Sequence, residues 1–381
     1  MFLAQYNKGV NMKIKSTQVW VNEELKPAVV VFEDGKITEI LGYDTDADVD
    51  YGEHKIFPGF IDIHTHGYNG CNGSKPTEDG LRMWMSSAPK EGLTSILVTT
   101  ATQGYEDNIK ALEIISAFME KEYEGTEILG INMEGNFICH EYKGAQNPNF
   151  IVAPNVKELA DYINASNHQL KTVLCAPERD ENYEFVKYAV KEGVSVSAGH
   201  SAATYDDIKG AVKHGLTGIT HTGNGMRPFH HREPGIYGAS MNMDDIYSET
   251  IGDGVHVNFE AVNILGRMKG KDRLVLVTDS GMEKGKKDFE GNVDPQTGAI
   301  YTETGILCGS SLSYNEVFCN LINKARLPLV TAVNAATINP ARYIKCDDRK
   351  GSIEVNKDAD FVVMDNDYQL VQVYCRGKGQ L

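Results

Sequence analysis

The sequence contains no run of 18 consecutive apolar residues, the length that a membrane-spanning helix needs. Its first residues, MFLAQYNKGVNMKIKS, also lack the apolar core of a signal peptide. Basic residues are in the minority, since 37 Lys and Arg stand against 53 Asp and Glu for a net charge of −16. Nucleic-acid binding needs clustered Lys and Arg, and anionic membranes attract basic surfaces. We therefore expect a cytoplasmic protein that binds neither nucleic acid nor membrane, although a few local cations would still admit a small anionic substrate.

Cysteine is scarce and scattered. The chain has seven cysteines, an odd number, and no CxxC pair. A disulfide framework is not expected in a chain of this length, so we expect reduced thiols. With 41% hydrophobic and 24% charged residues, the composition is that of an ordinary globular protein.

The middle of the chain alternates between short apolar runs and helix-like segments such as 106–123 and 206–215. The runs are apolar at nearly every position, as parallel strands buried on both faces are. Eight β/α units of this size predict a (β/α)8 barrel. A doubly wound open sheet is the alternative, but no GxGxxG follows an early strand. The eight runs are 59–67, 94–102, 127–135, 171–178, 193–200, 218–224, 249–257 and 272–280.

Both ends of the chain have the short, turn-broken segments of β structure. Glu33-Asp34-Gly35-Lys36 has the composition of a hairpin turn, with a glycine where a positive φ is needed. The last thirty residues have the same texture. We therefore expect one small β domain built from residues 1–57 and 346–381, and a barrel domain from residues 58–345.

Polar side chains that can bind a metal follow several of the expected strands. The carboxyl ends of barrel strands meet at one rim, so these residues are expected to converge. Each alone has an ordinary explanation, such as a hydrogen-bonded histidine or a helix N-cap. Together, buried imidazoles and carboxylates are costly without a cation, so we expect a divalent metal: Zn first, with Fe, Mn or Co as alternatives. The residues are His64 and His66 after the first strand, Glu134 after the third, His200 after the fifth, His221 after the sixth and Asp279 after the eighth.

This set of residues also predicts a reaction. A bound metal lowers the pKa of its water and polarises a carbonyl. A neighbouring aspartate takes the proton of that water and passes it to a leaving amine. The sequence therefore predicts metal-assisted hydrolysis of an amide or a related bond.

The motifs resemble a known family. PGFIDIHTHG (58–67) is similar to the opening motif of the amidohydrolase superfamily. Within it, the chain resembles the N-acetylglucosamine-6-phosphate deacetylases from about residue 13 onward. The motifs that carry this resemblance are MEG (133–135), APE (176–178), SAGHSAATYDD (197–207), HHREPG (230–235), VTDSG (277–281), ATINPAR (336–342) and KGSIEVNKDADFVVMD (350–365).

The resemblance implies a (β/α)8 barrel with a small β-sandwich domain from both termini. It implies removal of acetate from N-acetyl-D-glucosamine 6-phosphate to give glucosamine 6-phosphate. It assigns the main metal to Glu134, His200 and His221, and the general acid and base to Asp279. The pair His64 and His66 allows a second metal, so one or two ions per subunit are expected.

The resemblance also implies substrate contacts and a homodimer, because phosphate contacts in this family can come from a neighbouring subunit. Arg232 would bind the phosphate, with an ion pair to Glu233 as the alternative. His256 would bind the substrate, with a structural histidine as the alternative. The remaining implied contacts are Gln146 at the acetyl carbonyl and Asn224 and Gly225 at the phosphate.

The chain departs from the family pattern at Asn136 and in the loop of Thr222, Gly223 and Gly225, which leaves the sugar open. A deacetylase of N-acetylgalactosamine 6-phosphate, or another amidase of the superfamily, remains an alternative. Cyclic amidases usually carry a carbamylated lysine late in strand 4, whereas Lys171 lies at its start. A non-enzymatic relative would be expected to lose Asp279, which is present.

Overall fold

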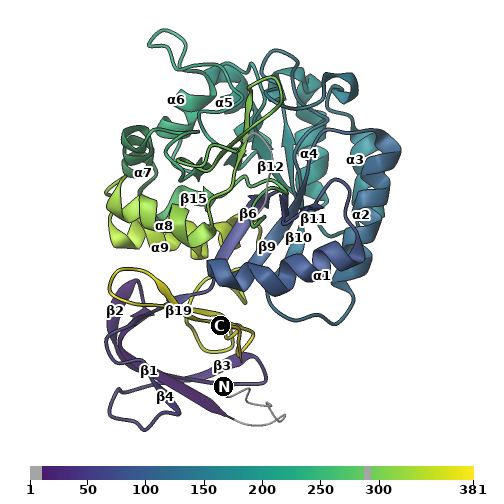
Figure 1. Cartoon of the computed structure of the whole chain (residues 1–381). Helices are drawn as coiled ribbons and strands as arrows, with labels where there is room; N and C mark the ends of the chain where they lie inside the picture. Colours follow the sequence, from purple (N-terminus) through teal and green to yellow (C-terminus); the bar gives the residue numbers. More distant parts are fainter. Residues whose placement is uncertain (1–10, 287–292) are drawn as a thin grey trace.

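The computed structural model describes residues 11–286 and 293–381. Residues 1–10, on which part of the signal-peptide argument rests, lie outside the described residues. Figure 1 shows a barrel surrounded by helices and, below it, a separate sheet to which both ends of the chain contribute. The fold class predicted from the sequence is thereby confirmed.

The barrel consists of eight parallel strands that are neighbours in chain order. The last strand returns to the first, where the backbone N–H of Asp279 donates to the carbonyl of His64 at 2.9 Å. All eight apolar runs therefore form strands, as predicted. The strands are β6 (Phe60–Thr65), β9 (Leu93–Thr100), β10 (Glu127–Met133), β11 (Leu170–Cys175), β12 (Ser195–Ala198), β13 (Gly218–Ile219), β14 (Tyr247–Ile251) and β15 (Leu274–Val277).

The helices cover the outside of the barrel (Figure 1). Their buried faces and the outer faces of the strands form one large apolar core. The α-helices are α1 (Glu78–Ser87), α2 (Tyr105–Met119), α3 (Val156–Ala165), α4 (Glu184–Lys191), α5 (Tyr205–Lys213), α6 (Gly235–Asn242), α7 (Phe259–Arg273), α8 (Tyr314–Asn323), α9 (Leu329–Ala336) and α10 (Ile338–Tyr343). Short 3-10 helices are η1 (Ala88–Glu91), η2 (Pro148–Phe150), η3 (Pro177–Arg179) and η4 (Glu181–Tyr183).

Every barrel strand is shorter than the apolar run that predicts it, and β13 and β14 illustrate the difference. The run 218–224 forms only β13, because the chain turns at His221 (φ 29°) and Gly223 (φ 103°). The run 249–257 begins two residues early and ends at Ile251. These early ends place the residues that follow on loops at the carboxyl rim.

The second sheet joins the two ends of the chain. Strand β18 from the C-terminal part pairs antiparallel with β5, and β5 pairs parallel with β1. The turn predicted at Asp34 and Gly35 is confirmed, since both have positive φ (48° and 80°) between paired Glu33 and Lys36. The strands are β1 (Met12–Val21), β2 (Glu24–Glu33), β3 (Lys36–Leu41), β4 (Val49–Asp50), β5 (Lys55–Pro58), β18 (Phe361–Met364), β19 (Leu370–Cys375) and β20 (Lys378–Gly379). Two further hairpins are β7 (Gly67–Tyr68) with β8 (Cys71–Asn72), and β16 (Ala299–Tyr301) with β17 (Leu307–Ser310).

A buried ionic cluster joins the start of β10 to the segment before β18. The ammonium of Lys350 lies 2.7 Å from Glu127, 2.8 Å from Asp358 and 2.6 Å from Asp360. Arg349 adds contacts of 2.6 Å to Glu127 and to Asp358. The barrel and the second sheet are thus connected by charges as well as by apolar packing.

Within the described ranges, no helix combines the length and the apolar character needed to cross a membrane. The seven cysteines, all of which lie in the described part of the chain, form no disulfide bond.

Candidate active site

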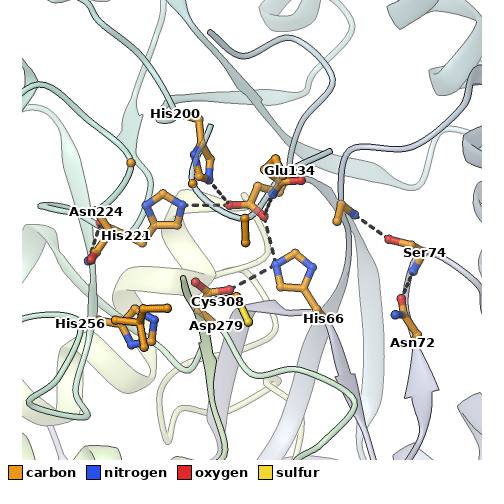
Figure 2. Close-up of a pocket in the computed structure, with 16 residues that line it drawn as sticks. His66, Asn72, Ser74, Glu134, His200, His221, Asn224, His256, Asp279 and Cys308 are labelled. Carbon is orange, nitrogen blue, oxygen red and sulfur yellow. Dashed lines mark hydrogen bonds and ion pairs between the residues drawn. The ribbon is translucent and has the colours of Figure 1, made fainter. Parts of the chain in front are cut away.

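Glu134 lies at the centre of a group of histidines at the carboxyl rim of the barrel (Figure 2). Its Oε1 atom is 3.0 Å from His200 Nε2 and 2.9 Å from His221 Nε2. These three buried side chains come from the ends of β10, β12 and β13, and their ligand atoms are close enough to share one metal ion. They are the residues that the resemblance assigns to the main metal.

The two histidines of the first strand and Asp279 form an adjoining group. Nε2 of His66 lies 3.1 Å from Glu134 Oε2 and 3.2 Å from Asp279 Oδ1. Nε2 of His64 lies 3.6 Å from the same oxygen of Asp279. His64, His66 and Asp279 could hold a second ion, with Glu134 between the two groups.

The contacts at Nδ1 of His200 and His64 leave the Nε2 atoms of both rings available to bind a cation. Nδ1 of His200 contacts the carbonyl oxygen of Tyr142 at 2.7 Å, and Nδ1 of His64 contacts the carboxylate of Glu249 at 3.0 Å. A neutral ring therefore carries its proton on Nδ1 and turns a lone pair at Nε2 toward Glu134. Among the described residues, the buried Nε2 of His64 has no hydrogen-bond partner. Lone pairs and carboxylates that face one another in this way are the donor set of a divalent metal.

The electrostatics of the group favour ionised carboxylates. Burial alone would raise the pKa of Glu134, but hydrogen bonds from His200 and His221 hold it well below its usual range. Burial also opposes the charge on Asp279, but electrostatic attraction to His64 and the hydrogen bond from His66 lower its pKa. For His66, burial would lower the pKa, yet Asp279 and Glu134 raise it to about 9. The two carboxylates therefore need positive charge beside them.

Three of these residues have a backbone conformation that favours glycine. The φ angles are 44° for His200, 29° for His221 and 48° for Asp279. Such strain is concentrated at functional sites, where surrounding contacts hold it in place. Gly225 packs against the ring of His200, and a larger residue would not fit there. A Cβ on Gly225 would lie 2.6 Å from His200 Nδ1.

The metal-binding groups open into a pocket of about 260 Å³. Four of the five expected substrate contacts line it, and Arg232 does not. Asn72, Ser74 and Cys308 also line it, although no sequence motif pointed to them (Figure 2). The four expected residues are Gln146, Asn224, Gly225 and His256.

The side chains of Gln146 and His256 are held in fixed orientations. Gln146 donates from Nε2 to Glu134 at 2.6 Å and accepts the N–H of Thr102 at 2.8 Å. Nδ1 of His256 contacts Asp253 at 2.6 Å. Gln146 thus contacts a metal-binding residue directly, a contact that the sequence did not indicate.

Arg232 lies on an exposed loop outside the pocket, and its guanidinium is 3.0 Å from His231 Nε2. The carboxylate of Glu233 accepts the backbone N–H groups of Tyr205 at 2.9 Å and Gly235 at 3.2 Å. Within this chain, therefore, Glu233 serves to fix the loop.

Asn136, which departs from the family pattern, is buried away from the pocket. Its amide donates to the carbonyls of Gln103 at 2.6 Å and Phe150 at 3.0 Å, and its oxygen accepts from Asn108 at 2.9 Å. Asn136 therefore adds hydrogen bonds between neighbouring segments and makes no substrate contact.

Glu249 was not singled out in the sequence. It lies inside β14, where its carboxylate contacts His64 and accepts the backbone N–H of His221 at 3.1 Å. The signal that could have found it is a carboxylate at the start of the predicted strand run 249–257, since a buried charge needs a partner.

Comparisons with known proteins agree with the site. The model of the amidohydrolase family matches residues 56–379. The N-acetylglucosamine-6-phosphate deacetylase of Bacillus subtilis (strain 168) is 32% identical over 370 residues, which cover 93% of each chain. The N-acetylgalactosamine-6-phosphate deacetylase of Escherichia coli O157:H7 is 31% identical over 85% of this chain and 87% of its own.

The fold comparison points the same way. A solved N-acetyl-D-glucosamine-6-phosphate deacetylase variant from Mycobacterium smegmatis, in complex with N-acetyl-D-glucosamine-6-phosphate, is similar over 98% of this chain and 100% of its own. The TM-score is 0.91 and the sequence identity 27%. The chain therefore belongs to the amidohydrolase family, among the N-acetylglucosamine-6-phosphate deacetylases.

Proposed function

We propose that this protein hydrolyses the acetamide of N-acetyl-D-glucosamine 6-phosphate to acetate and glucosamine 6-phosphate. One observation carries the proposal: a buried Glu134–His200–His221 group lies in a pocket beside Asp279. Sequence relatives that are 31 to 32% identical to this chain are deacetylases of N-acetylamino-sugar 6-phosphates.

Glu134, His200 and His221 would hold one divalent cation, and His64, His66 and Asp279 a second. The nitrogen and oxygen donors suit Zn, and also Fe, Mn or Co. When bound, the cation supplies a water of lowered pKa and a positive charge beside the scissile carbonyl.

Asp279 performs the proton transfers of this reaction. Its carboxylate accepts a proton from the water as the water oxygen bonds to the carbonyl carbon. The same proton then passes to the amine nitrogen as the C–N bond breaks. Gln146 and His256 line the pocket and would bind the carbonyl oxygen as negative charge develops on it.

The phosphate would be bound by the backbone of Asn224 and Gly225 and by the guanidinium of Arg232, whose planar fork suits bidentate contact. Because Arg232 lies outside the pocket of its own chain, we assign this contact to a neighbouring subunit of a cytoplasmic homodimer. We further propose domain boundaries that place residues 1–57 and 346–381 in the β domain and 58–345 in the barrel.

Acetate release tests the proposal. The substrates are N-acetylglucosamine 6-phosphate, N-acetylgalactosamine 6-phosphate and both free sugars, with metal analysis of the same sample. We expect N-acetylglucosamine 6-phosphate to be the preferred substrate. Preference for the galacto isomer would instead assign to this protein the activity named for the Escherichia coli relative. Rates on the free sugars equal to those on the phosphates would contradict phosphate recognition.

The Asp279→Asn variant tests the mechanism. It should lower turnover by about 10²- to 10⁴-fold, the range of general acid–base catalysis. Asp79→Asn, in the exposed first turn of α1, is the matched control and should retain full turnover. Full activity of Asp279→Asn would refute the assignment.

A further inference from the structure

A buried carboxylate lies directly behind the metal-binding side chains. Glu249 is in the middle of β14, and its side chain is only 5% exposed. It does not line the pocket, so it is not placed to contact substrate. Its position inside the barrel and its charge both call for an explanation, because an unpaired buried carboxylate is strongly destabilising.

One oxygen of this carboxylate contacts two candidate ligands from different strands. Oε2 lies 3.0 Å from Nδ1 of His64 and accepts the backbone N–H of His221 at 3.1 Å. The backbone carbonyl of Glu249 also accepts the N–H of Thr222 at 2.9 Å. Glu249 therefore connects the first and sixth strand ends at the point where the two ligand groups meet.

The contact with His64 determines the state of its ring. With Nδ1–H donated to Glu249, the lone pair of a neutral ring is on Nε2, which faces Glu134 and Asp279. Removal of the acceptor frees the ring to rotate and to carry its proton on Nε2, which cannot then bind a cation.

The contact with His221 acts on the backbone. His221 has a φ of 29°, so its backbone is strained. Its N–H is held by Glu249, and its carbonyl accepts the N–H of Asn224 at 3.0 Å. These bonds keep the ring of His221 turned toward Glu134.

We propose that Glu249 is a positioning residue for the cation site, acting through the ring of His64 and the backbone of His221. The inference rests on the proposed function, since it requires that the cluster binds a divalent cation.

The test measures cation affinity of the metal-free protein rather than turnover. Co²⁺ uptake is followed by its visible absorption in competition with a chelator, for wild type, Glu249→Gln and Glu249→Met. The amide oxygen of Gln can still accept from His64, whereas Met fills the space without an acceptor. We expect about 10-fold weaker binding for Gln and about 100-fold for Met, the range for the loss of an outer partner of a metal-binding histidine.

Glu127→Gln is the matched control, because Glu127 is a mostly buried glutamate at the amino end of β10. Its loss should lower the urea midpoint and leave Co²⁺ affinity unchanged. If Glu249→Met does not fold, the Co²⁺ affinity and the urea midpoint of Glu249→Gln decide the test. An affinity loss in Glu127→Gln equal to that in Glu249→Gln would overturn the proposal, since it would show a general effect of stability.

A double-mutant cycle tests the route of action. In the background of His64→Asn, the Glu249→Gln change should weaken Co²⁺ binding by much less than in wild type, because the ring on which it acts is gone. Equal losses in both backgrounds would overturn the action through the ring of His64, and a Glu249→Met affinity within about twofold of wild type would overturn the positioning role as a whole. Wild-type protein that takes up no cation would overturn the metal assignment of the proposed function as well.

Discussion

The ionic cluster around Lys350 makes the most direct prediction about stability. Lys350→Met removes an ammonium that is 1% exposed and lies within 2.8 Å of three carboxylates. Methionine retains much of the length of the side chain but leaves Glu127, Asp358 and Asp360 close together without their shared cation. Arg349 still contacts Glu127 and Asp358, so Asp360 is the carboxylate that loses most of its neutralising positive charge.

The magnitude follows from burial. At this separation and an effective dielectric constant of 20, each charge pair contributes roughly 4 to 6 kcal/mol before desolvation is subtracted. Desolvation of the ammonium and repulsion among the carboxylates remove most of that sum. Measured losses on breaking a buried pair are about 3 to 5 kcal/mol, and we expect Lys350→Met to fall in that range.

Lys36→Met is the control. Lys36 contacts Asp358 at 2.6 Å, but its side chain is 49% exposed. Solvent screening limits such a pair to about 0 to 1 kcal/mol. Both variants would be compared with wild type by urea unfolding at pH 7, followed by circular dichroism and by tryptophan fluorescence. Equal free-energy losses in the two variants would refute the reasoning, because it attributes the difference to burial alone.

Three further predictions follow from other contacts. The pKa of Glu127 falls from 4.5 to about 2 and that of Asp358 from 3.8 to about 2, because neighbouring cations outweigh burial. The stability that these shifts supply should be complete above about pH 4.5 and lost toward pH 2, and it amounts to about 3 kcal/mol for Glu127 alone. An unfolding free energy that stays constant over that pH range would contradict this prediction. Gly225→Ala should weaken cation binding far more than Gly52→Ala. Both glycines have positive φ, but a Cβ on Gly225 would lie against His200, whereas open space surrounds Gly52. Equal effects of the two variants in a Co²⁺ titration would refute the steric argument. Removal of metal by a chelator should abolish acetate release and lower the urea midpoint, and added Zn²⁺ should restore both; activity that survives complete metal removal would contradict the mechanism.

The sequence predicted the fold because the relevant patterns are local and repeated. Most barrel strands lie in apolar runs that can be recognised without their neighbours, and β9 is buried at all eight positions, whereas β13 has only two residues. The Asp34–Gly35 turn was recognisable because two consecutive positive φ angles favour those residue types. The convergence of polar residues followed from topology, since parallel strands place their carboxyl ends at one rim.

What the sequence could not predict depends on contacts between distant segments. The bond from Gln146 to Glu134 joins a loop to a strand end, and neither residue carries a pattern that reveals it. Glu249 is separated by 185 residues from His64, the ring it contacts. The place of Arg232 outside the pocket also depends on the path of a long loop, which composition does not determine.

Local rules fail most clearly where the candidate chemistry is concentrated. Positive φ at His200, His221 and Asp279 costs about 1 to 3 kcal/mol per residue, and the sum of about 3 to 9 kcal/mol is comparable to the whole stability of many proteins. The strain persists because neighbouring strands bind these backbones: His64 accepts the N–H of Asp279, and Glu249 that of His221. A strand that continued straight would alternate its side chains between two faces, whereas these turns direct side chains from three strands toward Glu134. In β12, β13 and β15 the same turns end the strand sooner than the apolar pattern predicts, so the errors in the lengths of these three strands and the geometry of the site have one physical cause.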